Sequence, residues 1–319
     1  MPHEHKIEHL TEVSRRKFLQ LSSLATGLVF ANSMISFESA AALPNAKLPG
    51  FTAFTKSVKV FMSDKYYLVE SNGLPTHQMM VGIKSWQQQV PTIQNYAGTN
   101  AWSIPRKPVI ATNPMSARSH FLRGAIAIAI NGVPIFNALN NRGDDAFLAG
   151  ELDDWGGHCG RADDYHYHVA PTHLQTIVGK KVPIAYALDG FPIYGETEVN
   201  GKKVTGLDDL NGHFDSKKNY HYHATNSYPY INGGFKGVVT EIDGQVDPQS
   251  LTKAFRPAGE PLRGAFISGL ERVGDSSFDL TYTLNGSEFH IKYTASLKEV
   301  KMQFIDSSGS IRTEVYQRK

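Results

Sequence analysis

The chain has 319 residues, of which 41% are hydrophobic and 19% charged, and its formal net charge is +2. This composition is that of a globular protein with one large or two modest cores, and it excludes a disordered or fibrous chain. Beyond the N-terminus there is no run of Lys or Arg, so we expect no nucleic-acid partner. Cys159 is the only cysteine, so stability must come without an intramolecular disulfide, from the core, from bound metal or from both.

The first 42 residues have the features of an export signal. Arg15 and Arg16 precede a moderately apolar stretch from Leu21 to Phe37, and Ala40-Ala41-Ala42 fits a small-residue cleavage site. The segment resembles a twin-arginine signal, which implies the twin-arginine export machinery as a partner in transit and a periplasmic or secreted mature protein. A retained membrane anchor is the alternative, but the stretch is polar in places and short for a span of roughly 20 apolar residues. We expect no stable membrane span after cleavage.

Residues 43–120 are predicted to form an N-terminal β-hairpin followed by loops. Residues 57–62 and 66–69 alternate apolar and polar side chains on either side of Asp64-Lys65, which is typical of two short antiparallel strands. Between Leu74 and Pro114 several prolines and the lack of a helical period favour long loops with short strands.

Residues 121–250 contain a pattern that occurs twice. The run 126–136 and the run 184–194 each combine an alternating strand, an Asx-Gly turn and a second strand that begins with proline. Both predict a hairpin, and in both we expect the residue before glycine, Asn131 or Asp189, to be a turn residue with positive φ. Asp189 keeps a minor chance of a functional role.

A second part of the pattern follows each hairpin. Residues 152–168 and residues 207–223 match at nine of seventeen positions and end in Tyr-His-Tyr-His. Chance identity over that length would give roughly one match, so this is an internal repeat. Two copies are too few for a solenoid, and they predict duplicated half-domains that pack about a pseudo-two-fold axis, with their equivalent ends brought together.

Residues 251–319 are predicted to close the chain with a small β-meander. Residues 278–296 alternate around Asn285-Gly286, and residues 299–316 alternate around Ser307-Ser308-Gly309, so we expect two hairpins. The fold class predicted for the whole chain is therefore mainly β: duplicated β-rich half-domains with pseudo-two-fold symmetry, plus the C-terminal meander.

The repeated histidines indicate a metal site. On a strand, alternate side chains share a face, so the two histidines of each Tyr-His-Tyr-His point the same way. A third histidine lies eight residues upstream and can fold back beside them. Three imidazoles with one open position suit zinc, copper or iron. The candidate ligands are His158, His166, His168, His213, His221 and His223. Each copy holds its own ion, or all six histidines share one site or a metal pair.

The alternative to a metal is a histidine–tyrosine hydrogen-bond network that joins the strands. The duplication favours a metal site over such a network, because six of the ten histidines beyond the signal occupy equivalent positions in the two copies. The tyrosines of each tetrapeptide, on the opposite face, are predicted to pack in the core. They are Tyr165, Tyr167, Tyr220 and Tyr222.

Other polar residues near the repeat have two open interpretations. The acidic residues ahead of each Gly-His step either orient a ligating histidine or form Asx turns and caps. These are Asp153, Asp154, Asp208 and Asp209. Cys159 is either a soft ligand or a small buried thiol, and burial is favoured. His77 and His120 are auxiliary ligands or acid–base groups at most.

The motifs together resemble the YHYH domain family. They are Asn131-Gly-Val-Pro-Ile, Gly157-His158, Tyr165-His-Tyr-His168, Asp189-Gly-Phe-Pro-Ile-Tyr-Gly195, Asn211-Gly-His213 and Tyr220-His-Tyr-His223 followed by Pro229-Tyr230. The resemblance covers roughly residues 70–240. It implies an exported bacterial protein and transfers no reaction and no catalytic residue.

Three functions fit these features. The first is a periplasmic metal-dependent enzyme, whose open metal position activates water or oxygen while a nearby Asp or Tyr handles protons. The second is a non-catalytic module that binds a small molecule or glycan and whose histidines are structural. The third is a periplasmic metal carrier. The sequence lacks the Gly-x-Ser-x-Gly, Walker and dinucleotide fingerprints of other enzyme classes.

Overall fold

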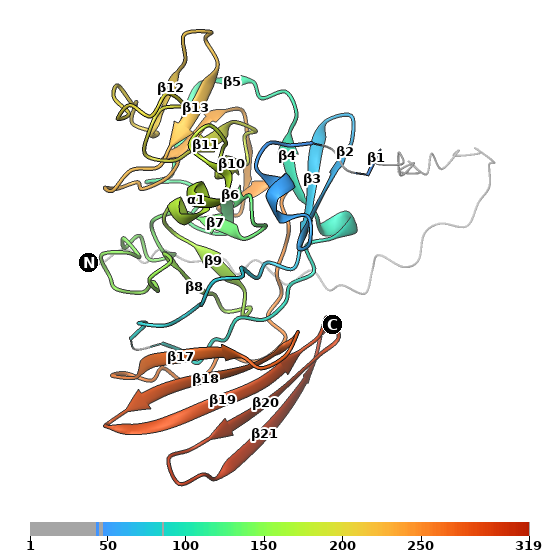
Figure 1. Ribbon diagram of the computed structural model, residues 1–319, viewed down its shortest axis with the longest axis vertical. Helices are drawn as coiled ribbons and strands as arrows, with labels where there is room; N and C mark the ends of the chain where they lie inside the picture. Colours follow the sequence, from blue (N-terminus) through green and yellow to red (C-terminus); the bar gives the residue numbers. More distant parts are fainter. Residues whose placement is uncertain (1–42, 45–46, 85, 319) are drawn as a thin grey trace, which may run out of the picture. The chain divides into compact units, whose positions relative to one another are not determined.

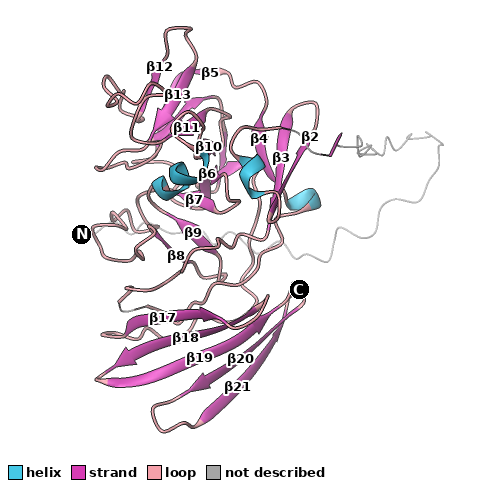
Figure 2. Cartoon of the chain, viewed as in Figure 1, coloured by secondary structure: helices cyan, strands magenta, loops and turns pink. Residues whose placement is uncertain are grey.

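The computed structural model describes residues 43–44, 47–84 and 86–318, so the predicted export signal at residues 1–42 lies outside the described residues. Strands dominate this part of the chain, and the helical segments are short (Figure 2). They are the 3-10 helices η1 (Phe51–Phe54), η2 (Gly98–Asn100) and η3 (Thr172–Leu174) and the α-helix α1 (Gln175–Val178). No helix among the described residues is long and apolar enough to cross a membrane. The prediction of a mainly β protein is confirmed.

The N-terminal segment forms a four-stranded sheet in the order β1-β2-β3-β4 (Figure 1). Its strands are β1 (Leu43–Pro44), β2 (Val58–Met62), β3 (Tyr66–Ser71) and β4 (Trp102–Pro105). β2 and β3 pair antiparallel, which confirms the hairpin predicted around Asp64-Lys65. Between β3 and β4 the chain runs mainly through loops, as its prolines predict.

An eight-stranded sheet contains both copies of the repeat (Figure 1). The first copy contributes β6 (Ala125–Ala129), β7 (Pro134–Phe136), β8 (Gly157–Cys159) and β9 (Tyr165–Tyr167). The second contributes β10 (Ala185–Ala187), β11 (Pro192–Tyr194), β12 (Gly212–Phe214) and β13 (Tyr220–His223). The order is β12-β13-β11-β10-β6-β7-β9-β8, so each copy runs outward from the central β10/β6 pair in the same strand sequence.

The register of the central pair relates the two copies. β6 and β10 are antiparallel, and Ile128 lies opposite Tyr186, its equivalent 58 residues later in the repeat. Ala127 faces Ala187, which is the equivalent of Ala129, and Ala129 faces Ala185, which is the equivalent of Ala127. A pseudo-two-fold axis through the Ile128–Tyr186 pair requires this register.

The equivalent strands that meet are β6 and β10, and the histidine-bearing strands of the two copies do not meet. Contact between the copies runs through β6 and β10, the first strand of each copy, so the strands with the tetrapeptides lie toward opposite edges of the sheet. β9 and β13 are separated by five strand intervals of about 4.8 Å, or about 24 Å.

The two Asx-Gly turns differ from the prediction in one respect. Gly132 and Gly190 have positive φ values of 82° and 97°, whereas Asn131 and Asp189 do not have positive φ. The amide of Gly132 donates to the carbonyl of Ala129, and the amide of Ala129 donates to that of Val133. The loop is thus a three-residue type, in which glycine alone needs the left-handed conformation. Asn131 and Asp189 are turn residues, but not with φ > 0.

Two small sheets flank this region. β5 (Ile110–Ser116) pairs with β14 (Gly234–Gly237), and β15 (Thr240–Ile242) pairs with β16 (Gln245–Asp247). The central strand β6 is buried along its whole length.

The C-terminal segment is a five-stranded antiparallel meander. Its strands are β17 (Phe266–Arg272), β18 (Ser277–Leu284), β19 (Ser287–Ala295), β20 (Glu299–Ile305) and β21 (Ile311–Gln317). Both predicted hairpin turns form. β17 was not predicted, because a register shift between Ile267 and Gly269 interrupts its alternation.

The meander packs against the rest of the described chain. Tyr293 donates its hydroxyl hydrogen to the carbonyl of Pro91 at 2.8 Å, and the amide of Ile267 donates to the carbonyl of Ile83 at 3.0 Å. Apolar side chains from all the larger sheets belong to one hydrophobic core.

Candidate metal centres

Each copy of the repeat places three histidines on or directly beside the two outermost strands at its end of the sheet. His158 on β8 lies opposite His166 on β9, and His213 on β12 lies opposite His221 on β13. His168 and His223 follow two residues later on the same face, as strand alternation predicts. We call His158, His166 and His168 the first histidine group, and His213, His221 and His223 the second.

The two groups are separate. The ligand atoms of each lie within 4.8 Å of one another, and no described cluster joins histidines of both copies. The alternative in which six histidines share one site is therefore wrong, because the copies meet through β6 and β10 at the centre of the sheet.

The first histidine group converges on its Nε2 atoms. The Nε2 atom of His168 lies 3.2 Å from that of His166 and 3.1 Å from that of His158. In a tetrahedral site with metal–nitrogen bonds of 2.0–2.1 Å, donor atoms lie about 3.3 Å apart. The three nitrogens therefore have nearly the spacing that one ion requires.

Backbone carbonyls hold the opposite nitrogen of each ring in the first group. The Nδ1 atoms of His158, His166 and His168 lie 3.1, 3.0 and 2.6 Å from carbonyl oxygens. A carbonyl only accepts hydrogen bonds, so each Nδ1 carries a proton, which leaves Nε2 as the atom that can offer a lone pair to a metal. The oxygens belong to Glu151, Asp164 and Asn137.

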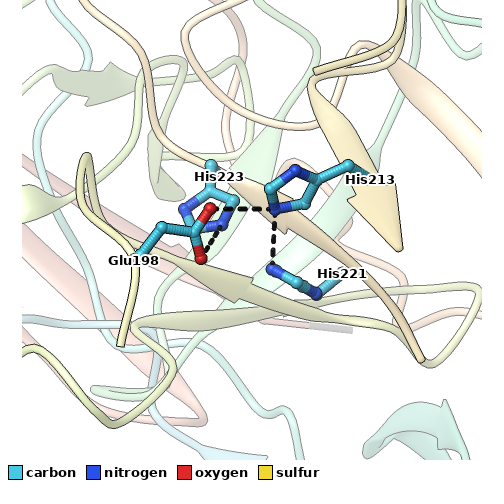
Figure 3. A group of neighbouring side chains, drawn as sticks. All are labelled: Glu198, His213, His221 and His223. Atoms are coloured by element: carbon cyan, nitrogen blue, oxygen red, sulfur yellow. Dashed lines mark hydrogen bonds and ion pairs between the residues drawn. The ribbon is translucent and has the colours of Figure 1, made fainter. Parts of the chain in front are cut away.

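The second histidine group includes an acidic residue (Figure 3). The Nε2 atom of His213 lies 3.0 Å from that of His221 and 3.3 Å from Oε1 of Glu198. Oε2 of Glu198 lies 3.9 Å from Nε2 of His223, and Figure 3 shows the carboxylate facing the rings. The Nδ1 of His223 donates to the carbonyl of Gly195 at 2.8 Å.

Glu198 was not predicted as a ligand from the sequence. It lies 15 residues before the Gly-His step, outside the matching part of the repeat, and its neighbours form no recognisable ligand motif. An alignment of the loop after β7 with the loop after β11 could have pointed to it, because Glu198 occupies the position equivalent to Asn140.

One buried nitrogen of the second group has no hydrogen-bond partner. His223 is 1% exposed, and its Nε2 is buried without any hydrogen-bond partner. A buried polar atom left unpaired costs about 1–3 kcal/mol. A cation at the centre of the group would pair it.

Burial favours the neutral form of four of the six histidines. It lowers the pKa of His158 to about 3 and that of His223 to about 4. The pKa values of His168 and His221 are lowered for the same reason. Neutral imidazole is the form that ligates metal, so at neutral pH these rings are ready to bind an ion.

The tyrosines of the two tetrapeptides lie on the other face of their strands, in the core, which confirms the prediction. Tyr165 donates to Asp153 at 2.8 Å, and Tyr220 donates to Asp208 at 3.0 Å. Burial raises the pKa of Tyr165, which therefore stays a hydroxyl and not a phenolate ligand.

The remaining two tyrosines meet the Asx-Gly turns. Asn131 donates its Nδ2 hydrogen to the Tyr167 hydroxyl at 3.0 Å, and Tyr222 donates to Asp189 at 2.5 Å. The turn residues therefore connect the hairpins to the back of the histidine strands.

The aspartates ahead of the Gly-His steps act as turn residues. Oδ1 of Asp153 accepts from the amides of Trp155 and Gly157, and Oδ1 of Asp208 repeats this arrangement in the second copy. Asp154 and Asp209 are exposed. The predicted role of orienting the histidines belongs to backbone carbonyls instead.

Gly157 is needed for the first group to form, and its replacement gives a test. A Cβ atom there would lie 2.5 Å from the Tyr165 hydroxyl, and at the equivalent Gly212 it would lie 2.1 Å from the Tyr220 hydroxyl. Gly157→Ala should push β8 away from β9, lower stability by about 1–3 kcal/mol and weaken metal binding at the first group. Denaturant unfolding and metal titration would measure this. Unchanged binding at the second group is the internal control, and an undisturbed first group would contradict the prediction.

Three other residues lie outside both groups. Cys159 is buried, which raises the pKa of its thiol well above the ordinary value, and it belongs to neither described ligand cluster. His77 contacts the Tyr167 hydroxyl through Nε2 at 2.6 Å and stacks on Trp155, on the tyrosine face. His120 pairs with Glu241.

Comparison with known proteins identifies part of the chain. Residues 101–203 match the model of the YHYH protein family. No curated protein and no solved structure matches the chain. The matched segment contains the first hairpin, the complete first histidine group and Glu198, and it ends before the second tetrapeptide. Over residues 101–203 this chain is therefore similar to the YHYH protein family, in agreement with the resemblance that the repeated tetrapeptide indicates.

Proposed function

We propose that this protein binds two transition-metal ions, one at each histidine group, and that it is a metal-dependent enzyme of the bacterial periplasm. The single observation that carries the proposal is the close approach of Nε2 atoms, at 3.1 and 3.2 Å for two pairs in the first group and at 3.0 Å for His213 and His221 in the second.

In the first group these contacts cannot all be hydrogen bonds. With the Nδ1 hydrogens donated to carbonyls, three Nε2 lone pairs face one another without a proton between them. Lone pairs at this distance repel, whereas a cation among them turns the repulsion into three bonds. The histidine–tyrosine network is less well supported, because the tyrosine hydroxyls lie on the opposite face and bond Asp or Asn.

The donor set favours zinc, copper or iron. Imidazole nitrogen suits these ions, whereas calcium and magnesium prefer oxygen. When bound with an open position, such an ion supplies an activated water or a polarised substrate atom. The rigid pairing of the ligand strands argues against a carrier, which must exchange its ion readily.

Export and duplication complete the proposal. We propose that residues 1–42 direct the folded, metal-loaded chain through the twin-arginine route, which carries folded proteins. The β6/β10 register and the palindromic strand order support an origin of the two halves by duplication about a pseudo-two-fold axis.

Elemental analysis of the mature protein, exported in its native host and purified without chelator or affinity tag, tests the proposal. We expect two ions per chain, and one in the variant with His166→Ala and His168→Ala. The variant with His221→Ala and His223→Ala should also retain one. His120→Ala, which changes a histidine outside both groups, should retain two. A wild-type protein that carries no metal and takes up none on addition of zinc, copper or iron would contradict the proposal.

A further inference from the structure

The two histidine groups differ at one equivalent position. Asn140 and Glu198 occupy the same place in the loops after β7 and β11, because their backbones make the same hydrogen bonds. The amide of Asn140 donates to the carbonyl of Asp144 at 2.8 Å, and that of Glu198 donates to the carbonyl of Lys202 at 2.9 Å. The bridges Leu139–Asp145 and Thr197–Lys203 frame both loops alike.

The side chains at this position behave differently. Glu198 extends its carboxylate to His213 and His223 (Figure 3). Asn140 turns back into its own loop, where Oδ1 accepts from the amides of Arg142 and Asp144 at 2.9 and 3.1 Å. Within the described residues, the first ligand cluster therefore has three histidines, whereas the second has three histidines and a carboxylate.

The surroundings of the two groups also differ. A cavity of about 640 Å³ is lined by all three histidines of the first group, and none of the four residues of the second group lines it. The charged residues of its lining are Lys84, Arg123, Arg142 and Arg161 against Glu151 and Asp164. This excess of positive charge favours a small anionic ligand.

We infer that the two metal sites have different roles, an inference that rests on the proposed function. The second site holds its ion with four protein ligands, including Glu198, and is structural. The first site holds its ion with three histidines and keeps one position open toward the cavity, where a small anion binds. Four protein ligands are typical of structural zinc sites, and three with an open position are typical of catalytic ones.

Cobalt-loaded full chain and the azide ion provide the test. The variant with His221→Ala and His223→Ala keeps only the first site, and its cobalt absorption spectrum should change as azide is added. The variant with His166→Ala and His168→Ala keeps only the second site, and its spectrum should not change over the same range. We expect apparent azide affinities that differ at least tenfold.

Exchanging the two equivalent side chains gives the matched controls. Asn140→Glu should supply a fourth ligand and weaken the azide response of the first site at least tenfold. Asn140→Asp keeps the turn-forming oxygen and adds the charge but is one methylene shorter, so the response should persist. Glu198→Ala should create an azide response at the second site.

The outcomes separate this inference from the proposed function. If cobalt binds at neither site, the proposed function fails. If cobalt binds at both sites and azide affects both equally, or affects only the second site, the inferred difference in roles is wrong, but the proposal of two metal sites is not contradicted. Circular dichroism of each variant shows whether it is folded, and the Asn140 and Glu198 variants leave every histidine in place.

Discussion

The metal-free protein is expected to lose several kcal/mol of stability as the pH falls from 7 to 4.5. The cause is the set of histidines that burial keeps neutral. The pKa of His158 is lowered from 6.5 to about 3, and those of His173 and His223 to about 4. Below pH 6.5 the unfolded chain takes up protons that the folded chain cannot.

The sign follows from proton linkage. Because the unfolded state binds more protons between pH 6.5 and the folded-state pKa values, stability increases with pH across this window and is lost as the pH falls. Each histidine contributes a slope of up to about 1.4 kcal/mol per pH unit. His77, His168 and His221, whose pKa values are also lowered, act in the same direction.

Asp189 opposes this trend. Burial raises its pKa from 3.8 to about 6, with hydrogen bonds from Tyr222 and neighbouring amides acting against the shift. Between pH 3.8 and 6 the folded state holds a proton that the unfolded state has released. The contribution of Asp189 to the stability of the folded protein therefore increases as the pH falls. Burial also raises the pKa values of Asp153 and Asp163, which act in the same direction as Asp189. Three carboxyls oppose six histidines, so we expect the histidines to decide the outcome.

Urea unfolding of the chelator-treated protein at half-unit steps from pH 8 to 4.5 measures the effect. The stability should change little above pH 7 and fall steeply below 6.5. His158→Gln removes one titrating ring and should make the decline shallower. A stability that stays level, or increases, from pH 6.5 to 4.5 would show that these histidines are not held neutral.

Arg256→Ala is expected to lower stability by about 3–5 kcal/mol. Arg256 donates from Nε and Nη2 to the carboxylate of Asp163 at 2.6 and 2.7 Å, and the two side chains are 5% and 1% exposed. Arg256 also donates to the carbonyl of Gln88. Removing the guanidinium leaves a buried carboxylate without its charge partner, in the loop just before the first Tyr-His-Tyr-His.

Two variants separate this mechanism from loss of packing. Asp163→Asn combined with Arg256→Met removes both charges, and it should be more stable than Arg256→Ala alone. Arg142→Ala breaks exposed ion pairs with Asp144 and Glu151, and it should change stability by about 1 kcal/mol or less. Thermal unfolding compares all three. Equal losses for Arg256→Ala and Arg142→Ala would contradict the argument.

Features that depend on neighbouring residues could be predicted from the sequence. The alternating runs indicated the β2/β3 hairpin and the turns of the meander, and the repeat indicated two copies of one unit. Strand alternation placed the imidazoles of His166 and His168 on one face and the tyrosines on the other, because side-chain direction along a strand is fixed by local backbone geometry.

Features that depend on how the strands associate could not be predicted. Periodicity does not say which strands of the two copies meet, so the sequence could not show that β6 and β10 form the centre and place the histidine groups near opposite edges. The roles of the aspartates depended on the same packing, since Tyr165 and Tyr220 reach Asp153 and Asp208 on the face away from the histidines.

The three imidazoles of each candidate site could be predicted from the sequence alone, because they lie in a Gly-His step and a Tyr-His-Tyr-His that occur in both copies. The number of sites, and the carboxylate that distinguishes the second from the first, depend on how the chain folds. Glu198 and Asn140 lie far along the chain from the rings they distinguish, and a contact of that kind is made by strand pairing and loop placement, not by sequence proximity.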